Sequence, residues 1–338
     1  NTGWESRVVS ESTTEVEIRG PKASFVEDLM PNMALIRRRV RDYSLRFEGL
    51  RIGQRSKTDV VMAYIEGLVN DGILHEVKTR LQKIKTDSVL ASNYIEEFIE
   101  DSKYSIFPKM ERTERPDKAS AAILEGRIVI MVDGTPFVAI APAVFWNFLQ
   151  SPTDYYEKYI MGSFWRLIRL LAMFLAISSS SIYVLLTSFH QEMLPTSLAL
   201  KIAADRQGVP FPAVMEAIIM EILLEAMNEA GLRLPKALGQ TVSIVGTLVI
   251  GQAAVQAGLV GPVLVIAVAT GAIASYAIPS FAMSGAIRLL RFPVLFCSSL
   301  FGIFGFLGAI IFITLYLMSL RSFGAPFYSP ISPFIKED

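Results

Sequence analysis

The stretch FPVLFCSSLFGIFGFLGAIIFITLYLMSL, residues 292–320, contains no Asp, Glu, Lys, Arg or His. A helix rises about 1.5 Å per residue and the hydrocarbon core of a bilayer is about 30 Å thick, so about 20 apolar residues cross it. The stretch is longer than that and predicts one tilted membrane-spanning helix. Cys297, the only cysteine of the chain, lies within it and is expected to pack as a small apolar residue.

Other apolar segments precede this stretch. Residues 170–189 form a second uncharged run of spanning length, and residues 238–257 and 260–281 predict two further spans joined by a tight turn. Hydrophobic residues make up 52% of the 338 residues and the mean hydropathy is +0.42, which excludes an ordinary soluble protein. The sequence therefore predicts an all-α polytopic membrane domain over residues 159–320.

The charged residues lie mostly before residue 158. The chain therefore consists of a polar part followed by an apolar part, although its net charge is zero. This distribution predicts an α/β domain over residues 1–158, then the membrane domain, then a short extended tail over residues 321–338. The chain opens on Asn1 without an initiating Met, and we expect the α/β domain to be truncated at its N-terminus.

The first part of the chain has the patterns of a small sheet covered by helices. Residues 45–52 alternate between apolar and polar side chains, as half-buried strands do, and Asp133-Gly134 predicts a hairpin turn. Further strands are expected over residues 59–65, 127–132 and 137–140, helices over residues 32–40, 73–84, 89–99 and 118–125, and a loop over residues 102–117. This order predicts an α/β domain with a small mixed sheet.

No set of catalytic side chains is evident in this domain. His75 stands alone on a predicted helix, and the acidic residues between 96 and 101 are expected to form a solvated helix face. Neither a phosphate-binding glycine loop nor a dinucleotide-binding motif occurs. We therefore expect no enzyme activity, no cofactor and no metal site.

Two groups of arginines are candidates for contact with a membrane or a partner. Arg37, Arg38 and Arg39 are adjacent, so they cannot share one helix face; they form either a solvated helix end or a contact with lipid headgroups or a partner subunit. Arg166 and Arg169 flank the first apolar run on its N-terminal side, next to a group of aromatic residues. The positive-inside rule then predicts a cytoplasmic α/β domain.

Residues 211–230 are apolar enough to enter a bilayer but also carry acidic residues. Glu221, Glu225 and Glu229 fall within a stripe about 80° wide, while Glu216 lies on another face. A carboxylate at mid-depth costs about 2.5–3.5 kcal/mol, so the stripe needs water, a partner charge or protonation. The segment is either an amphipathic helix that lies flat in the interface or a helix that faces a water-filled path.

The number of spans depends on this segment. Five membrane helices result if residues 211–230 cross the bilayer and four if they do not. The basic residues outside the spans are Arg166, Arg233 with Lys236, and a short basic connector over residues 284–291. The five-helix count puts all of them on the cytoplasmic side and the tail on the other side, whereas the four-helix count returns the tail to the cytoplasmic side. The distribution of basic residues favours five.

Many short segments resemble one known family, the A subunit of the GerA-type spore germinant receptors. The similar segments are NMALIRRR (32–39), GQRSKT (53–58), IEEFIED (95–101), TERPD (113–117), VDGTP (132–136), LQSPTDYY (149–156), GVPFP (208–212), EAGLRLP (229–235), RLLRFP (288–293) and SLRSFG (319–324). The stage V sporulation protein AF, a paralogue, shares part of this pattern. The intact segments QSPTDYY (150–156) and TSFHQEMLPTSLAL (187–200) favour the receptor subunit.

The resemblance implies a protein of the inner membrane of bacterial spores, with its soluble domain on the spore-core side. It implies a permease-like B subunit and a lipoprotein C subunit as partners, together with further copies of the chain itself. It also implies that the copies oligomerise into a channel that releases cations when nutrient arrives.

The residues and the resemblance together give a hypothesis for the mechanism. Glu221, Glu225 and Glu229 would attract cations along a pore, and Met220 and Ile222 are candidates for a hydrophobic constriction that closes by dewetting. The alternative is a non-conducting scaffold that docks the B and C subunits and passes the signal to them.

Overall fold

The computed structural model describes residue 15 and residues 20–102, 104–233 and 249–331. The chain forms two compact units. The first unit contains residues 1–165 and 316–338, and the helical unit contains residues 166–315. The residues that follow the last long helix therefore belong to the same unit as the N-terminal part of the chain.

The first unit contains a five-stranded sheet with the strand order β1-β2-β4-β5-β3. The strands are β1 (Leu45–Ile52), β2 (Thr58–Ile65), β3 (Glu111–Thr113), β4 (Ile128–Val132) and β5 (Val138–Ala141). Every pairing in this sheet is antiparallel, so the expected mixed sheet is wrong. The reason is that β1–β2 and β4–β5 are hairpins, which are antiparallel by construction, and the helical crossover returns β4 antiparallel to β2.

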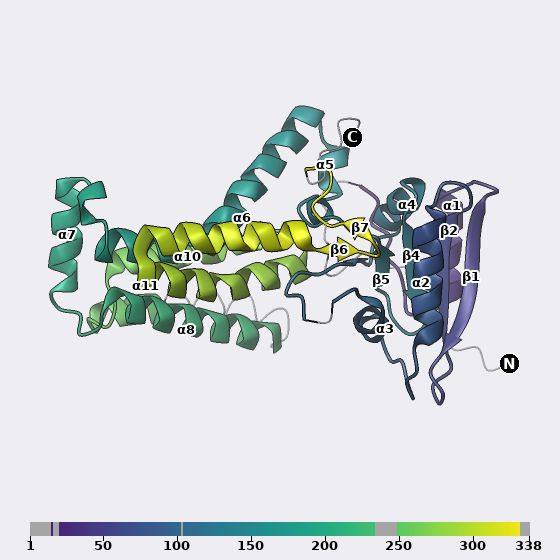
Figure 1. Cartoon of the computed structure of the whole chain (residues 1–338), viewed down its shortest axis with the longest axis horizontal. Coiled ribbons are helices and arrows are strands. Elements are labelled where there is room, and N and C mark those ends of the chain that lie inside the picture. Colours follow the sequence, from purple (N-terminus) through teal and green to yellow (C-terminus); the bar gives the residue numbers. More distant parts are fainter. Residues whose placement is uncertain (1–14, 16–19, 103, 234–248, 332–338) are drawn as a thin grey trace. The chain divides into compact units, whose positions relative to one another are not determined.

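Helices cover both faces of this sheet (Figure 1). One face carries α2 (Asp71–Lys83) and α3 (Ser92–Ile99), and the other carries α1 (Leu29–Arg39) and α4 (Pro116–Leu124). Successive residues of a strand point to opposite faces, so Val60 and Met62 of β2 lie in the core below α2 and α3. Val61 and Ala63 lie in the core below α1 and α4. The expected α/β domain thus has three layers.

Local signals set the starts of these helices. The Asn70 side chain accepts hydrogen bonds from the backbone N–H groups of Gly72 and Ile73 at the start of α2. The Asp28 side chain caps α1 in the same way, and Pro116 occupies the first turn of α4, where its missing N–H is not needed. A short 3₁₀ segment, η1 (Phe145–Phe148), and α5 (Thr153–Tyr156) follow β5 and lead towards the helical unit.

The remaining elements are mostly helices. They are α6 (Tyr159–Ser188), η2 (Gln191–Met193), α7 (Thr196–Arg206), α8 (Ala213–Arg233), a helical segment over residues 249–256, α10 (Pro262–Tyr276) and α11 (Phe281–Ser319). Within the described residues, α6 and α11 are long and apolar enough to cross a membrane, and α10 is a shorter apolar helix. The count of four to five spans is not confirmed. The predicted span over residues 238–257 lies partly outside the described residues.

Helix α11 is interrupted at Gly302, where the backbone has φ 58° and ψ −136°. Figure 1 shows the helix folding back there into two arms, coloured light green and yellow. The expected helix over residues 292–320 is therefore not continuous but divided at Gly302, in a backbone conformation that only a glycine adopts without strain. That this segment crosses a membrane stays a prediction. The first arm begins at Phe281 and includes Arg288 and Arg291, so the predicted basic connector over residues 284–291 is also helical.

The chain ends, as far as it is described, in a small hairpin within the first unit. Strand β6 (Arg321–Ser322) pairs with β7 (Ala325–Pro326), and Ser322 and Phe323 are buried. Because this hairpin and residues 1–165 belong to one unit, both lie on the same side of any membrane that the helical unit crosses. This arrangement requires an even number of crossings, whereas the favoured five-helix count puts the tail on the opposite side.

Candidate functional site in the helical unit

Helix α8 packs one face into the interior of the helical unit. Ala217, Met220 and Leu224 are buried there in one apolar cluster with Val184 of α6 and Leu264 of α10. Glu216 and Glu221 are buried as well. Two carboxylates thus enter a largely apolar interior, and each requires a partner.

Glu221 forms the most deeply buried ion pair among the described residues. One of its oxygens, Oε2, lies 2.5 Å from Nη1 of Arg291, and the side chains are 2% and 3% exposed. Ser180 of α6 donates a hydrogen bond to the other oxygen. The remaining nitrogens of Arg291 donate to the carbonyl oxygens of Ala176 (2.8 Å) and Gly271 (3.2 Å). Four helices, α6, α8, α10 and α11, therefore meet at one charged pair.

Small side chains permit this meeting. A Cβ at Gly271 of α10 would collide with Oγ of Ser179 on α6, so the two backbones approach closely next to Arg291. A buried ion pair offsets its desolvation only when its geometry is good and its other donors and acceptors are satisfied. Here both carboxylate oxygens and the guanidinium have partners. The cluster is therefore a stable junction of the four helices.

Glu216 holds a second junction of the same kind. Its Oε2 accepts a hydrogen bond of 3.0 Å from the backbone N–H of Gly261, just before α10. Its Oε1 lies 3.5 Å from Nη2 of Arg206, the last residue of α7. The side chain is completely buried. Glu216 thus ties α8 to the ends of two other helices.

The two remaining glutamates of α8 are more accessible. Oε1 of Glu225 lies 3.5 Å from Nη1 of Arg288 on α11, and the Glu225 side chain is 43% exposed. Glu229 pairs with Arg233 one turn later on the same helix, at 2.6 Å, and both side chains are exposed. All four glutamates of α8 thus have an arginine beside them. We call these four pairs, Glu216–Arg206, Glu221–Arg291, Glu225–Arg288 and Glu229–Arg233, the arginine–glutamate ladder.

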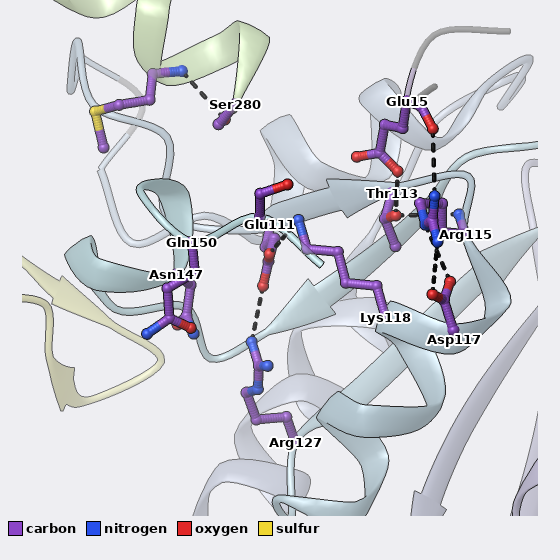
Figure 2. A network of polar contacts seen from close by, with 12 residues as sticks. Glu15, Glu111, Thr113, Arg115, Asp117, Lys118, Arg127, Asn147, Gln150 and Ser280 are labelled. Carbon is purple, nitrogen blue, oxygen red and sulfur yellow. Dashed lines mark hydrogen bonds and ion pairs between the residues drawn. The ribbon is translucent and has the colours of Figure 1, made fainter. Parts of the chain in front are cut away.

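A separate polar network lies in the first unit (Figure 2). Glu111 of β3 is buried between Lys118 at 2.7 Å and Arg127 at 2.8 Å. Burial alone would raise the pKa of Glu111, but the charges of Lys118 and Arg127 outweigh it and hold the pKa below its usual value. The network fixes β3, α4 and the start of β4 to one another.

The comparisons with known proteins concern the entire chain. Residues 1–338 match the family model described as Bacillus/Clostridium GerA spore germination protein. The chain belongs to the GerA family. This confirms the resemblance found in the sequence.

Individual GerA-family relatives are similar over most of the chain. Spore germination protein KA of Bacillus subtilis (strain 168) is 49% identical over 332 residues, which are 98% of this chain and 61% of that protein. The "uncharacterized membrane protein YfkQ" of the same organism is 48% identical over 336 residues, which are 99% of this chain and 66% of that protein. The chain therefore spans 61% and 66% of the lengths of these two relatives.

One solved structure is also similar. It is the crystal structure of the N-terminal domain of the A subunit of the Bacillus megaterium spore germinant receptor GerK3, with 46% sequence identity and a TM-score of 0.31. The similarity covers 36% of this chain and 98% of that chain.

The five residues predicted to line a pore do not share one environment in this GerA-family chain. Met220 and Glu221 are buried inside the helical unit, whereas Ile222 is 54% exposed. Glu225 is half-buried and Glu229 is exposed. Among the described residues, Ile222, Glu225 and Glu229 are thus the predicted pore residues that one chain leaves at least partly accessible. That a conducting path runs along α8 stays a prediction.

The predicted headgroup or interface arginines lie at two places in the GerA-family chain. Arg37 and Arg38 are exposed at the end of α1, and the Arg37 guanidinium lies 5.0 Å from the centre of the Phe47 ring. Arg39 is half-buried and donates a hydrogen bond to the Leu35 carbonyl oxygen. Arg166 and Arg169 are half-buried on α6, and the role of all five in contact with lipid or a partner stays a prediction.

Sequence reasoning missed the two most informative residues of the site, Arg288 and Arg291. A signal for them existed, because residues three apart share a face once the segment is helical. Two arginines on one face, in a helix that is otherwise apolar, require acidic partners inside the membrane domain. The carboxylates of α8 are those partners.

Proposed function

We propose that this chain is the A subunit of a nutrient germinant receptor, and that its copies assemble into a ligand-gated cation channel in the spore inner membrane. The role in germination is supported by the family and by the relative named a spore germination protein. The channel is supported by one observation. The buried face of α8 is fixed by Glu221, while Ile222, Glu225 and Glu229 remain accessible from the single chain.

The accessible part of α8 needs an environment other than lipid. Carboxylates that face hydrocarbon are costly, so Glu225 and Glu229 favour a water-filled space. A single chain has no internal symmetry that would enclose such a space, and a ring of copies supplies it. In this arrangement Glu225 and Glu229 attract cations, and the exposed Ile222 side chains form a constriction that closes by dewetting.

Glu221 and Met220 have a different role in this proposal. Glu221 is committed to Arg291, so it sets the rotation of α8 within the bundle instead of facing ions. Met220 packs in the apolar cluster beside it. The residues at which copies of α8 face one another are therefore set by the junction at Glu221, on the neighbouring part of the helix surface.

The first unit would lie on the spore-core side and dock the permease-like B subunit and the lipoprotein C subunit. Arg166 and Arg169 support this orientation by the positive-inside rule, since they lie near the start of α6. Arg37 and Arg38 are exposed and thus accessible to a partner or to lipid headgroups.

A second candidate function is a non-conducting scaffold, and the arginine–glutamate ladder favours it. Each carboxylate of α8 has a cation beside it, so α8 and its partner arginines together carry little net negative charge with which to attract cations. A scaffold would use the ladder only to hold its helices together.

The experiment that separates the two functions compares two alanine substitutions in spores. Ile222→Ala shortens the side chain at the proposed constriction and so widens it. Ile266→Ala, on α10, is the control because Ile266 is similarly exposed (66%). Cation release is measured with and without nutrient, and subunit level is measured by immunoblot. Leak without nutrient in Ile222→Ala alone, at normal level, supports the channel. Equal behaviour of the two variants would overturn it and favour the scaffold.

A further inference from the structure

Two short connections tie the helical unit to the first unit, and each is held by an arginine–aspartate pair. The entry connection runs through α5 into α6. The hydroxyl of Tyr156, the last residue of α5, donates a hydrogen bond of 2.5 Å to Oδ2 of Asp117. Asp117 in turn binds Arg115 through both of its oxygens, at 3.1 Å and 2.7 Å. We call Arg115, Asp117 and Tyr156 the entry clasp.

Two residues of the entry clasp, Arg115 and Asp117, are nearly inaccessible, whereas Tyr156 is 38% exposed. Arg115 is 2% exposed, and Figure 2 shows its guanidinium facing the Asp117 carboxylate. A Cβ at Gly162, in the first turn of α6, would lie 2.7 Å from the carbonyl oxygen of Asp154 in α5. The backbone at the start of α6 therefore lies directly against the backbone of α5.

The exit connection runs from the end of α11 into the β6–β7 hairpin. The backbone N–H of Phe323 donates a hydrogen bond of 2.6 Å to Oδ2 of Asp101, and Oδ1 of Asp101 accepts one of 2.6 Å from Nη2 of Arg80. The Arg80 guanidinium also lies 4.9 Å from the centre of the Phe323 ring. We call Arg80, Asp101 and Phe323 the exit clasp.

The neighbours of Phe323 hold the exit clasp from both sides. Ser322 is completely buried; its hydroxyl donates to the carbonyl oxygen of Lys109 and accepts from the backbone N–H of Ala143. Phe327 is also buried, and its carbonyl oxygen accepts a hydrogen bond of 2.7 Å from the N–H of Phe145. Phe323 has φ 50°, a conformation that a residue with a side chain keeps only where its surroundings enforce it.

We propose that Asp117 and Asp101 are positioning residues that carry rearrangements of the first unit to the ends of α6 and α11. Only Glu157 and Lys158 separate the entry clasp from α6, and only Leu320 to Ser322 separate Phe323 from the end of α11. An extended residue spans at most about 3.6 Å, so these links hold little slack. A displacement of either clasp is therefore a displacement of a helix end.

The two clasps differ from the ordinary ion pairs of the first unit. Arg46 and Glu66 form a pair with side chains 55% and 62% exposed, and such a surface pair contributes little. The clasps are charge-assisted, partly or fully buried, and attached to the chain segments that lead into the helices. Glu66→Ala is thus the matched control for Asp101→Ala and Asp117→Ala.

The inference rests on the proposed function, and its test starts with germination. Spores carrying Asp101→Ala, Asp117→Ala or Glu66→Ala are given nutrient, and the fall in optical density and the cation release are followed. Loss of either clasp is expected to slow the response roughly 5- to 150-fold, the range that coupling between sites commonly spans. Glu66→Ala is expected to respond normally. Normal responses in both aspartate variants would overturn the inference.

A second pair of variants separates coupling from folding. Asp101→Ala and Asp117→Ala are each combined with Ile222→Ala, and leak without nutrient is measured at matched subunit levels. Because the clasps act before the constriction opens, the double variants are expected to leak as Ile222→Ala does. Leak that disappears in the double variants would mean that the clasps are needed only for structure or assembly, and would overturn the inference.

The same set distinguishes the failure of the two proposals. If Ile222→Ala does not leak, the channel assignment fails, while the slowed fall in optical density of the aspartate variants still reports on coupling. Tyr156→Phe, which removes only the hydroxyl of the entry clasp, is expected to slow germination in the same direction as Asp117→Ala. A normal response in Tyr156→Phe together with a slow one in Asp117→Ala would exclude Tyr156 from the coupling route.

Discussion

Arg291 of α11 and Glu221 of α8 form an ion pair of 2.5 Å in the interior of the helical unit, 70 residues apart in the sequence. The pair joins two helices directly and two more through Ser180 and the carbonyl oxygen of Gly271. Because both side chains are buried, removal of one charge would leave the other without a partner charge in the interior. The first prediction follows from this dependence.

Arg291→Met is expected to destabilise the helical unit by about 3–5 kcal/mol, because Glu221 would remain buried without its cation. The double variant Arg291→Met with Glu221→Leu is expected to recover most of that loss, since it removes both charges. Thermal unfolding of the detergent-solubilised chain and its level in membranes measure the effect. Arg233→Met is the control, because its pair with Glu229 is exposed. An Arg291→Met variant as stable as the control would contradict the assignment.

Gly302→Ala is expected to destabilise the turn between the two arms of α11. The backbone at Gly302 has φ 58°, and a Cβ there would lie 3.2 Å from the Phe189 ring, so the cost is of order 1–3 kcal/mol. Gly308→Ala is the matched control, because a Cβ at that helical position meets no atom within 4 Å. The midpoint of thermal unfolding should fall for Gly302→Ala and stay the same or rise for Gly308→Ala. Equal midpoints would argue against a turn at Gly302.

Gly271→Ala is expected to separate α10 from α6, because the new Cβ would collide with Oγ of Ser179. Overpacking of this kind costs about 1–3 kcal/mol. Ser179→Ala in the same chain removes the colliding oxygen and should restore most of the stability. The double-variant cycle, measured by thermal unfolding, tests the contact itself. Additive effects of the two substitutions would mean that the helices do not touch at this point.

The entry clasp is expected to weaken at high pH. Burial, followed by the hydrogen bond to Asp117, raises the pKa of Tyr156 to about 12 from its ordinary value of 10.0. A raised folded-state pKa means that the contribution is fully present below the unfolded-state pKa. It is lost as the pH rises from about 10 to 12. Thermal unfolding of the chain across this range should show a loss of stability that Tyr156→Phe does not show.

The same clasp has an opposite dependence at low pH. Burial would raise the pKa of Asp117, but the hydrogen bonds from Arg115 and Tyr156 lower it below its ordinary value of 3.8. A lowered folded-state pKa means that the stabilisation is present above the unfolded-state pKa and is lost as the pH falls through the folded-state pKa. Asp117→Ala should therefore remove a stability change below about pH 4. A variant that keeps the full change would assign it to other carboxylates.

The regular parts of the first unit could be predicted from local pattern alone. Strand β1 has the expected bounds, residues 45–52, because its apolar side chains pack on the sheet. Leu45 and Phe47 join the core below α1 and α4, and Leu50 and Ile52 join the core below α2 and α3. Strand β3 was not predicted. It is three residues long and contains Glu111 and Arg112, whose charges are balanced by partners elsewhere in the chain, so the segment has the composition of a loop.

The candidate site could be predicted only in part, because its chemistry depends on long-range contacts. The acidic stripe of α8 follows from helical spacing, and the helix has nearly the expected bounds. The arginines that pair with Glu225 and Glu221, Arg288 and Arg291, lie in the segment over residues 284–291, for which the sequence predicts a basic connector. Similarly, Gly302 lies in an apolar run that predicts a continuous helix, and its positive φ of 58° has no signal in the local sequence.

The arginine–glutamate ladder determines how the helical unit responds to an electric field. A membrane potential acts on each elementary charge with about 2.3 kcal/mol per 100 mV. When a glutamate of α8 moves together with its arginine, the work done on the two opposite charges cancels. Movement of the ladder as intact pairs, with both charges displaced equally along the field, would therefore carry little gating charge.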